Sequence, residues 1–341
     1  MKKRVKTIFA HAPDGVDAIL IMNGSFADPA FFYVTGYRNG LFERSAAILY
    51  PDGGIEVICP ELEATAADPD AHVYHDREEK RDLFEELLAA DTIGVNASMI
   101  SHRDANWLQE LHPNVSLVDV SDAIRQARMV KDGEEIAAIR RACNIAAEVA
   151  DMLPGLLEED VSESQVLAEV QYALAQRGAT PSFPPIVAFG RHSSLPHYTT
   201  GEAALAWPAL VDFGARYHRY CSDVTRTFVG SDEQKEAHGT VREAQLHALD
   251  MMEPGVRARD VHAMVDDFFV GRGYPSLPHS LGHSIGLEVH DGVSLGRDSD
   301  LVLREGMVVT VEPGVYLDGR WGVRVEDDVL VTADGVDVLT R

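Results

Sequence analysis

The stretch VRVEDDVLV, residues 323–331, places three carboxylates in the middle of an apolar strand pattern. Valine and leucine alternate around Glu326, Asp327 and Asp328, as in a strand that packs into a core. Burying an ionised carboxylate is costly unless a partner or a metal ion compensates. We assign Glu326 as a metal ligand, because pairing with the strand pattern that ends at Glu312 could bring the two acids together. Arg324, on the same face of an alternating strand, is then its neighbour or a substrate contact. Of the two remaining acids, we expect one beside the site and one facing solvent near the strand's end.

A second strand pattern, MVVTVE at residues 307–312, ends in another acid. Glu312 stands immediately before a Pro-Gly turn, and 307–312 is a candidate hairpin partner of 323–331. Such pairing would bring Glu312 and Glu326 together. Considered alone, Glu312 would be an ordinary strand-end acid in contact with water.

Two more carboxylates lie in ALVDFGARYHRYCSDVTRTFV, residues 209–229. Asp212 ends one apolar run, and Asp223 begins the returning strand. A hairpin of this size would bring the two carboxylates to one place. Taken singly, each could equally be a turn-flanking or a surface acid.

Three histidines fall within PHSLGHSIGLEVHD, residues 278–291. The HExxH motif of zinc proteases is excluded, because Ser280 occupies the position that requires Glu. The segment also contains two glycines, which disfavour a helix. If it is extended, His279 and His283 share a face, whereas His290 needs a bend to join them.

Two Asp, two Glu and one His make an oxygen-rich ligand set. Such a set suits two divalent cations bridged by carboxylates better than one tetrahedral zinc ion. Hard oxygen ligands with a single imidazole favour Mn²⁺, with Co²⁺, Fe²⁺ and Zn²⁺ as alternatives. Two such ions would roughly neutralise four carboxylates, which makes their burial tolerable.

The composition excludes several classes of partner. The chain has 341 residues and carries 55 Asp plus Glu against 30 Lys plus Arg, a net charge of −25. So acidic a surface argues against nucleic acid or an anionic membrane as partner. Six of the basic residues are lysine, so salt adaptation is an alternative to an ordinary acidic surface. Three separated cysteines and the lack of a signal-peptide core or an apolar stretch of about 20 residues predict a cytoplasmic protein.

The pattern of elements predicts two domains, 1–122 and 123–341. A hairpin at 46–60, a helix at 83–89 and a strand at 92–96 indicate a small α/β domain first. The second part is expected to be α+β, with helices set against a sheet. We place those helices at 128–153, 162–177, about 235–252 and about 258–270.

The sequence resembles the pita-bread metallopeptidases, in particular their Xaa-Pro dipeptidase (prolidase) and aminopeptidase P branch. The likeness lies in the order of five residues along the chain: Asp212, Asp223, His283, Glu312 and Glu326. The stretches FGRHSSLPHYTTG, SDVTRTF, GHSIGLEVHD, VVTVEPGVY and GVRVEDDVLVT carry the likeness. DPAFFYVTGY, residues 28–37, is similar to the creatinase-type N-terminal domain of that family. The resemblance implies a pita-bread catalytic domain, preceded by this smaller α/β domain, and usually a homodimer.

The resemblance also implies a role for each site residue. The dinuclear ligands would be Asp212, Asp223, His283, Glu312 and Glu326. His197 and His279 would contact the substrate, and His290 would contact the scissile carbonyl. The implied reaction is hydrolysis of an Xaa-Pro peptide bond by metal-activated water, with Glu312 passing the proton to the leaving nitrogen.

One position departs from the family pattern. Many prolidases have an arginine four residues after the position of His290, where it would bind the carboxylate of a dipeptide; here Ser294 stands there. Both dipeptides and longer peptides with proline second are therefore candidate substrates. A non-peptidase reaction, such as a lyase reaction on the same metal site, is the alternative.

Overall fold

The computed structural model describes residues 1–341 and divides into two compact units, Met1–Arg128 and Met129–Arg341. The boundary expected after residue 122 falls inside helix α5 (Ser121–Met129). This helix belongs almost wholly to the first unit because Ile124 is buried and the hydroxyl of Tyr33 donates to the carbonyl of Ala127. The Tyr33–Ala127 hydrogen bond joins residues 94 positions apart in the chain, so the local pattern of the sequence could not indicate it.

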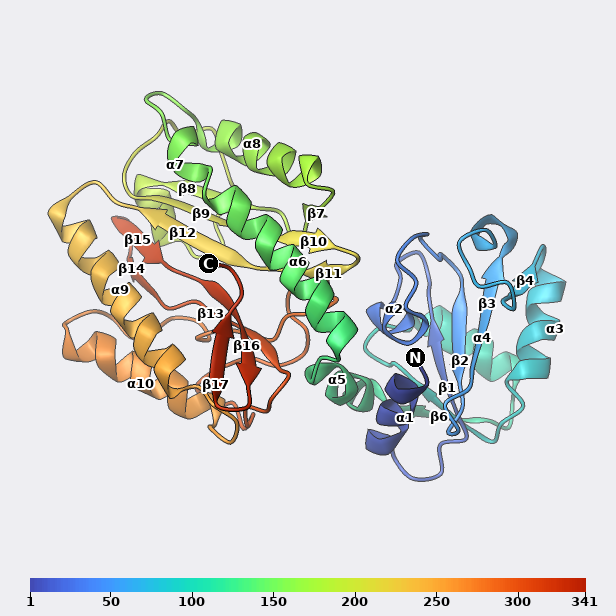
Figure 1. The fold of residues 1–341 in the computed structure, drawn as a ribbon. Coiled ribbons are helices and arrows are strands. Elements are labelled where there is room, and N and C mark those ends of the chain that lie inside the picture. The colour runs from blue at the N-terminus through green and yellow to red at the C-terminus, as the bar shows by residue number, and fades with distance from the viewer. The chain divides into compact units, whose positions relative to one another are not determined.

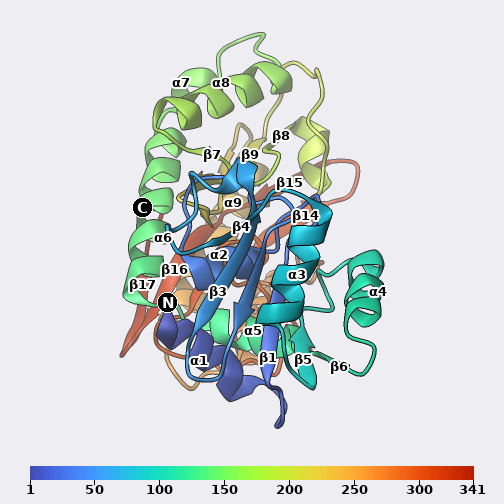
Figure 2. The same cartoon turned by 90° about the vertical axis from the view of Figure 1, so that its right-hand side faces the viewer.

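The first unit is a six-stranded mixed sheet in the order β4-β3-β2-β1-β5-β6 (Figure 1, Figure 2). The expected hairpin is the pair β2–β3, and helices α3 and α4 pack Phe84 and Leu108 against one face of the central strands. Its elements are α1 (Lys2–His11), β1 (Ala18–Met22), α2 (Pro29–Thr35), β2 (Ala46–Leu49), β3 (Ile55–Pro60), η1 (Glu61–Glu63), β4 (His72–Tyr74), α3 (Arg77–Leu87), β5 (Thr92–Val95), α4 (His102–Leu111) and β6 (Ser116–Asp119). The α/β prediction for this unit is confirmed.

The second unit is α+β, as expected, and begins with α6 (Gly133–Ala150). Asp132 caps this helix, accepting hydrogen bonds from the backbone N–H groups of Glu134 and Glu135, so the helix starts later than residue 128. The remaining elements are α7 (Leu153–Leu156), α8 (Glu163–Gln176), β7 (Thr180–Pro181), β8 (Ile186–Phe189), η2 (Gly190–Ser194), β9 (Ala209–Phe213), β10 (Ala215–Tyr217), β11 (Tyr220–Cys221), β12 (Val224–Phe228), α9 (Asp232–Met251), α10 (Ala258–Gly271), β13 (Val308–Val311), β14 (Gly314–Leu317), β15 (Trp321–Arg324), β16 (Asp327–Thr332) and β17 (Gly335–Val338). No helix of the chain combines the length and apolar character needed to cross a membrane.

Two hydrophobic cores build the second unit in halves. In one half, α6 and α8 pack against the sheet β8–β9–β12; in the other, α9 and α10 pack against β13–β16–β17 (Figure 1). The halves join where the backbone N–H of Glu326 donates to the carbonyl of Thr225 in β12, at 3.2 Å. The four carboxylates that the sequence predicts as metal ligands lie near this junction.

The opening stretch, residues 323–331, is not one strand. It divides into β15 and β16, and the segment that pairs with it, residues 308–317, likewise divides into β13 and β14. β13 pairs with β16 and β14 with β15, so the predicted antiparallel pairing is correct but interrupted. Pro313 has no N–H to continue the ladder, and the N–H of Glu326 turns toward β12 instead. The interruption leaves Glu312 and Glu326 at the gap between the two strand pairs.

Candidate metal centre

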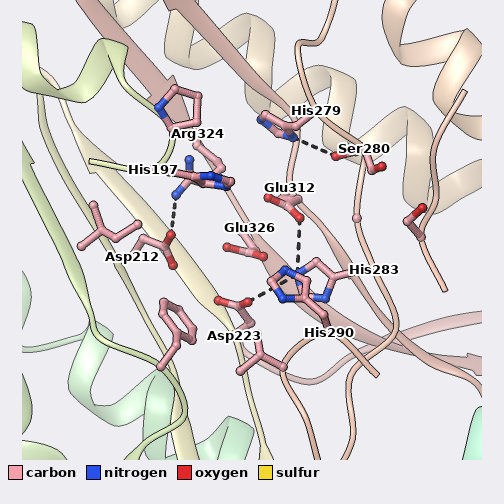
Figure 3. A pocket seen from close by; sticks show the side chains of 16 residues that line it. His197, Asp212, Asp223, His279, Ser280, His283, His290, Glu312, Arg324 and Glu326 are labelled. Carbon is pink, nitrogen blue, oxygen red and sulfur yellow. Dashed lines mark hydrogen bonds and ion pairs between the residues drawn. The ribbon is translucent and has the colours of Figure 1, made fainter. Parts of the chain in front are cut away.

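A cavity of about 370 Å³ lies within the second unit, and both halves contribute to its walls. All the site residues expected from the sequence line it: His197, Asp212, Asp223, His279, His283, His290, Glu312, Arg324 and Glu326 (Figure 3). Ser294 also lines the cavity. The structure thus brings all the expected side chains to one cavity, although they come from distant segments.

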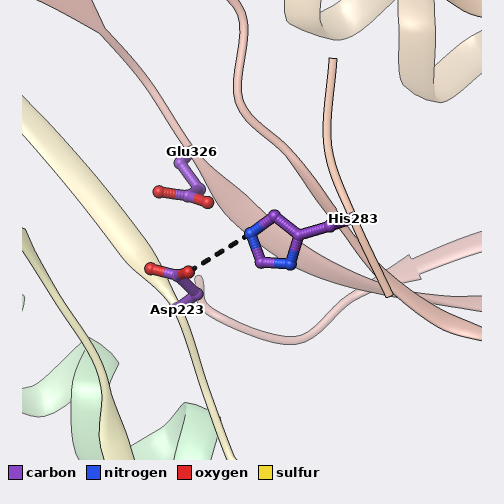
Figure 4. Close-up of side chains that lie close together, drawn as sticks. All are labelled: Asp223, His283 and Glu326. Atoms are coloured by element: carbon purple, nitrogen blue, oxygen red, sulfur yellow. Dashed lines mark ion pairs between the residues drawn. The ribbon is translucent and has the colours of Figure 1, made fainter. Parts of the chain in front are cut away.

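Asp223, His283 and Glu326 form the tightest group. One potential ligand atom of each lies within 4.8 Å of those of the other two, and all three residues are buried (Figure 4). Nε2 of His283 is 3.5 Å from a carboxylate oxygen of Asp223 and 3.5 Å from one of Glu312. If Nδ1 of His283 carries the proton, it donates to the carbonyl of Ser284 at 3.3 Å. Nε2 then directs a lone pair toward the carboxylates, as a metal-ligating imidazole does.

Asp212 lies on the other side of the cluster, where its partner is Arg324. The guanidinium of Arg324 forms an ion pair with one oxygen of Asp212 and donates to the hydroxyl of Thr225 at 3.0 Å. That hydroxyl in turn donates to Glu326 at 2.6 Å. Arg324 therefore contacts Asp212 directly and Glu326 through Thr225, which supports the sequence-based placement of this arginine beside the expected ligands.

The buried carboxylates lack enough donors within the protein. One oxygen of Asp212 and one of Asp223 are buried with no hydrogen-bond partner. Burial raises the pKa of Asp212, although Arg324 opposes the rise. Burial and then the neighbouring carboxylate of Glu326 raise the pKa of Asp223 well above its ordinary value. Orphaned oxygens on mutually repelling carboxylates are what divalent cations would satisfy, so the residues present fit such ions.

The histidine segment is not a helix, in agreement with its two glycines, and it forms isolated bridges at His283 and Ser284 followed by bends at residues 286–290. His283 forms an antiparallel bridge with Ser294, and its backbone N–H donates to the hydroxyl of Thr310 at 3.0 Å. Gly282 allows this close approach, since a Cβ there would lie 1.9 Å from the carbonyl oxygen of Thr310. The bend needed for His290 is present: the rings of His283 and His290 are 4.2 Å apart between centroids.

The histidines that line the cavity differ in whether their ring nitrogens are hydrogen-bonded within the protein. Nδ1 of His279 is 2.8 Å from the carbonyl of Ser280, and its Nε2 is 3.0 Å from the hydroxyl of Tyr316. Both nitrogens are therefore occupied within the protein. His197 and His290 are exposed at the cavity. Partial burial and then the nearby His283 lower the pKa of His290, which favours the neutral imidazole, a form that can donate one hydrogen bond.

Sequence reasoning did not single out Tyr316. Its hydroxyl is 2.9 Å from Arg324, which donates to it, and burial raises the pKa of this phenol to about 12. Tyr316 thus links Arg324 to His279. Nothing in the local pattern of β14 distinguishes it from any half-buried strand tyrosine.

The expectation that Asp327 or Asp328 faces solvent is wrong, because both are fully buried. Strand β16 is the central strand of its sheet, with one edge paired to β13 and the other to β17. Asp327 is paired with Arg226 at 2.9 Å and with Arg341 at 2.7 Å. Asp328 accepts from the backbone N–H of Asp223 at 2.9 Å, and burial raises its pKa to about 8.

The fold and the cavity together define a class: an α+β protein with a buried carboxylate–imidazole cluster suited to divalent cations. Residues 137–333 match the model of metallopeptidase family M24, and residues 4–130 match the creatinase/prolidase N-terminal domain. The chain belongs to metallopeptidase family M24. Membership implies divalent metal ions, and it confirms the predicted pita-bread catalytic domain behind a creatinase-type N-terminal domain.

Known relatives resemble the chain over its full length. It is 33% identical to a Xaa-Pro dipeptidase of Pyrococcus horikoshii, over 100% of this chain and 97% of that protein. The structure of a Xaa-Pro dipeptidase from Bacillus anthracis matches with a TM-score of 0.90 and 29% identity, covering 100% and 96% of the two chains. An X-Pro aminopeptidase from Thermotoga maritima matches with a TM-score of 0.86 and 30% identity, covering 96% of each.

Proposed function

We propose that this protein is a metal-dependent peptidase that hydrolyses the Xaa-Pro bond of dipeptides or short peptides. The observation that carries the proposal is the cluster of Asp223, His283 and Glu326 on a cavity wall, with orphaned carboxylate oxygens beside it. Membership of family M24 and full-length similarity to Xaa-Pro peptidases support the reaction type. No observation favours the non-peptidase alternative.

The proposed metal ligands are Asp212, Asp223, His283, Glu312 and Glu326, holding two divalent cations. The predominance of carboxylate oxygens over imidazole favours Mn²⁺, with Co²⁺, Fe²⁺ and Zn²⁺ as alternatives. When bound, such ions supply Lewis acidity and a water acidic enough to act as nucleophile near neutral pH.

The protein's own residues would handle the protons and the substrate. Glu312 lies at the cavity with part of its side chain accessible, so it can accept a proton from water and deliver it to the proline nitrogen as the peptide C–N bond breaks. Neutral His290 can donate a hydrogen bond to the carbonyl oxygen as negative charge develops there. His197, exposed at the cavity, would hold the substrate.

The geometry changes the role that we propose for two other residues. His279 has both nitrogens engaged with Ser280 and Tyr316, so we propose that it shapes the wall rather than donating to the substrate. Arg324 is committed to Asp212, Thr225 and Tyr316, so it positions a ligand rather than binding a peptide carboxylate.

The length of the peptide follows from the charges in the cavity. Arg324 is the only lysine or arginine among the residues that line it, and Ser294 adds no charge. The carboxylate of a dipeptide, which lies close to the scissile bond, therefore finds no uncommitted lysine or arginine among the residues that line the cavity. We propose that longer Xaa-Pro-Yaa peptides are cleaved at least as well as Xaa-Pro dipeptides.

A peptide panel tests these statements. The protein is loaded with Mn²⁺, its metal content is measured, and release of proline from Xaa-Pro and of the first residue from Xaa-Pro-Yaa is followed. Cleavage of Xaa-Pro bonds but not of matched Xaa-Ala bonds is the expected result. A folded, metal-loaded sample that cleaves neither class contradicts the proposal.

We also propose that the protein is a cytoplasmic homodimer. Its three cysteines are buried and free, which suits a reducing compartment. Sedimentation equilibrium measures the oligomeric state, and a monomer at micromolar concentration would overturn the dimer.

A further inference from the structure

The segment that carries His197 is held by one buried carboxylate outside the metal centre. Glu163 is the first residue of α8, and its side chain is fully buried. Its sequence neighbours gave no reason to select it: it stands inside the capping box of Ser162 and Gln165, where an acid is ordinary.

Each oxygen of Glu163 accepts two hydrogen bonds. One oxygen accepts from the backbone N–H of Phe189 and from Nδ1–H of His192, both at 2.8 Å. The other accepts from the hydroxyl of Tyr198 at 2.9 Å and from the backbone N–H of Gly201 at 3.2 Å. These four donors span residues 189–201, so a single carboxylate fastens both ends of the segment and its interior.

The fastened segment reaches the cavity only through its middle. His197 lines the cavity and is exposed, while the next residue, Tyr198, is bonded to Glu163. The ring of His192 stacks on that of Tyr198, with centroids 4.6 Å apart and an interplanar angle of 23°. The exposed histidine therefore lies next to a network of buried and half-buried groups, in which all four donors point at the fully buried carboxylate of Glu163.

We propose that Glu163 is a positioning residue that fixes His197 for substrate binding. An amide in place of the carboxylate offers one acceptor oxygen where two are needed. Glu163→Gln therefore turns an NH2 group toward one pair of donors, and each pair includes a backbone N–H, which cannot accept. The segment would then loosen while the proposed metal ligands, which lie in other segments of the chain, keep their places. This inference rests on the proposed function, in which His197 holds the substrate.

A double-mutant cycle tests it. With the metal-loaded enzyme and an Xaa-Pro-Yaa peptide, Glu163→Gln is expected to raise KM about tenfold and change kcat less than about threefold, because the loss concerns binding of the substrate. His197→Ala should act similarly, and the double variant should be no worse than His197→Ala within about twofold, since residues acting through one another are not additive. Effects that multiply, or an unchanged KM in Glu163→Gln, overturn the proposal.

Two further variants separate positioning from general stability. Gln165→Ala removes the side chain that completes the capping box with Ser162 at the same helix end, and Gln165 contacts none of the four donors to Glu163. It is expected to lower the melting temperature without changing KM. If Glu163→Gln does not fold, Tyr198→Phe removes a single donor and should raise KM to a smaller extent.

Hydrogen exchange provides a readout that does not need activity. Amides within 189–201 should exchange faster in Glu163→Gln than in the wild type and in Gln165→Ala, at equal metal content. Unchanged amide exchange in Glu163→Gln contradicts the proposal that Glu163 holds residues 189–201 in place. A wild-type protein that cleaves no peptide would defeat the proposed function, yet the exchange experiment would still decide whether Glu163 holds the segment.

Discussion

Asp223 is buried beside other carboxylates and pairs with no lysine or arginine. In the metal-free protein it is an unfavourable group, because burial and the charge of Glu326 both oppose its ionisation. We predict that Asp223→Asn stabilises the metal-free protein by about 1–2 kcal/mol, because a neutral amide avoids burying a negative charge beside other carboxylates. The same change should abolish most of the stabilisation that Mn²⁺ gives to the wild type.

Thermal unfolding with a chelator and with Mn²⁺ measures both effects of Asp223→Asn. Asp250→Asn is the matched control, since Asp250 is an exposed acid on α9 and should alter neither value. If Asp223→Asn binds metal and gains stability from it as the wild type does, Asp223 is not a ligand.

Glu312 is the proposed proton carrier. Its side chain is 16% exposed, more than that of Asp223, so water and substrate can reach it. We predict that Glu312→Gln lowers kcat by about 10²–10⁴, the range for losing a general acid–base group. The loss is larger if the substitution also removes a metal ligand. Metal analysis of the same sample distinguishes the two causes. Activity near that of the wild type would contradict the assignment.

The limits of sequence prediction are clearest at single residues. The five expected ligands stood out because each places a polar side chain where an apolar pattern predicts core, and all five line one cavity. Tyr316 and Glu163 carry no such contrast: a tyrosine in a strand and an acid at a helix start are ordinary residues. Their significance arises from partners such as Tyr198, which lies 35 residues from Glu163 in the chain.

Among the elements, the interrupted ladder of β13–β16 and β14–β15 positions the acids. The pattern of valines predicted the pairing correctly, because alternation reports which residues face a core. It did not predict the break, which depends on Pro313 and on the hydrogen bond from Glu326 to β12. It also misjudged the exposure of Asp327 and Asp328, because burial of a strand on both faces depends on its neighbours.

The contact between β13 and the histidine segment provides a test at this scale. We predict that Gly282→Ala destabilises the protein by about 1–3 kcal/mol, as overpacking does, because its Cβ would collide with the backbone of Thr310. The displaced segment should also carry His283 away from Asp223 and weaken metal binding.

Gly239→Ala is the matched control for that substitution. Gly239 lies inside α9 with open space around it, so alanine should stabilise the helix by about 0.5–1 kcal/mol. Urea unfolding and a metal titration compare the two variants. Equal stability and metal affinity in Gly282→Ala and the wild type would show that the close approach is not required.

For the whole molecule, the stability of the metal-free form should depend on pH. The folded-state pKa values of Asp212, Asp223 and Glu326 are raised, and that of Asp328 is about 8. A carboxyl with a raised folded pKa stabilises the fold fully below its unfolded pKa, and this contribution is lost as pH rises through the folded value. The melting temperature with chelator should therefore fall between about pH 5 and pH 9, within the range over which these groups ionise.

Bound metal should reverse part of that trend. Ions compete with protons for the same carboxylates, so the stabilisation by Mn²⁺ should grow as pH rises. Melting curves at several pH values, with chelator or with Mn²⁺ and at constant high salt to screen the surface, separate the two effects. A metal-free melting temperature that rises from pH 5 to pH 8 would contradict the assignment of raised pKa values.

The net charge of −25 should make the whole protein sensitive to ionic strength. Repulsion among exposed acids is screened as the Debye length falls from about 10 Å at 0.1 M to about 3 Å at 1 M salt. Buried pairs such as Lys131–Asp291, whose side chains are 0% and 4% exposed, are screened far less and continue to hold the fold. We therefore predict that the melting temperature rises by several degrees between these concentrations of NaCl.

A variant in which surface charge is reduced tests whether repulsion is the cause. Glu158, Glu159 and Asp160 form an exposed acidic run, and the positive φ of 65° at Asp160 is tolerated by asparagine. Replacing them with Gln, Gln and Asn removes three negative charges without touching the core. The variant should melt higher than the wild type at low salt and gain less from added NaCl. If both proteins gain equally, the salt effect arises from exclusion of salt from apolar surface rather than from relief of repulsion.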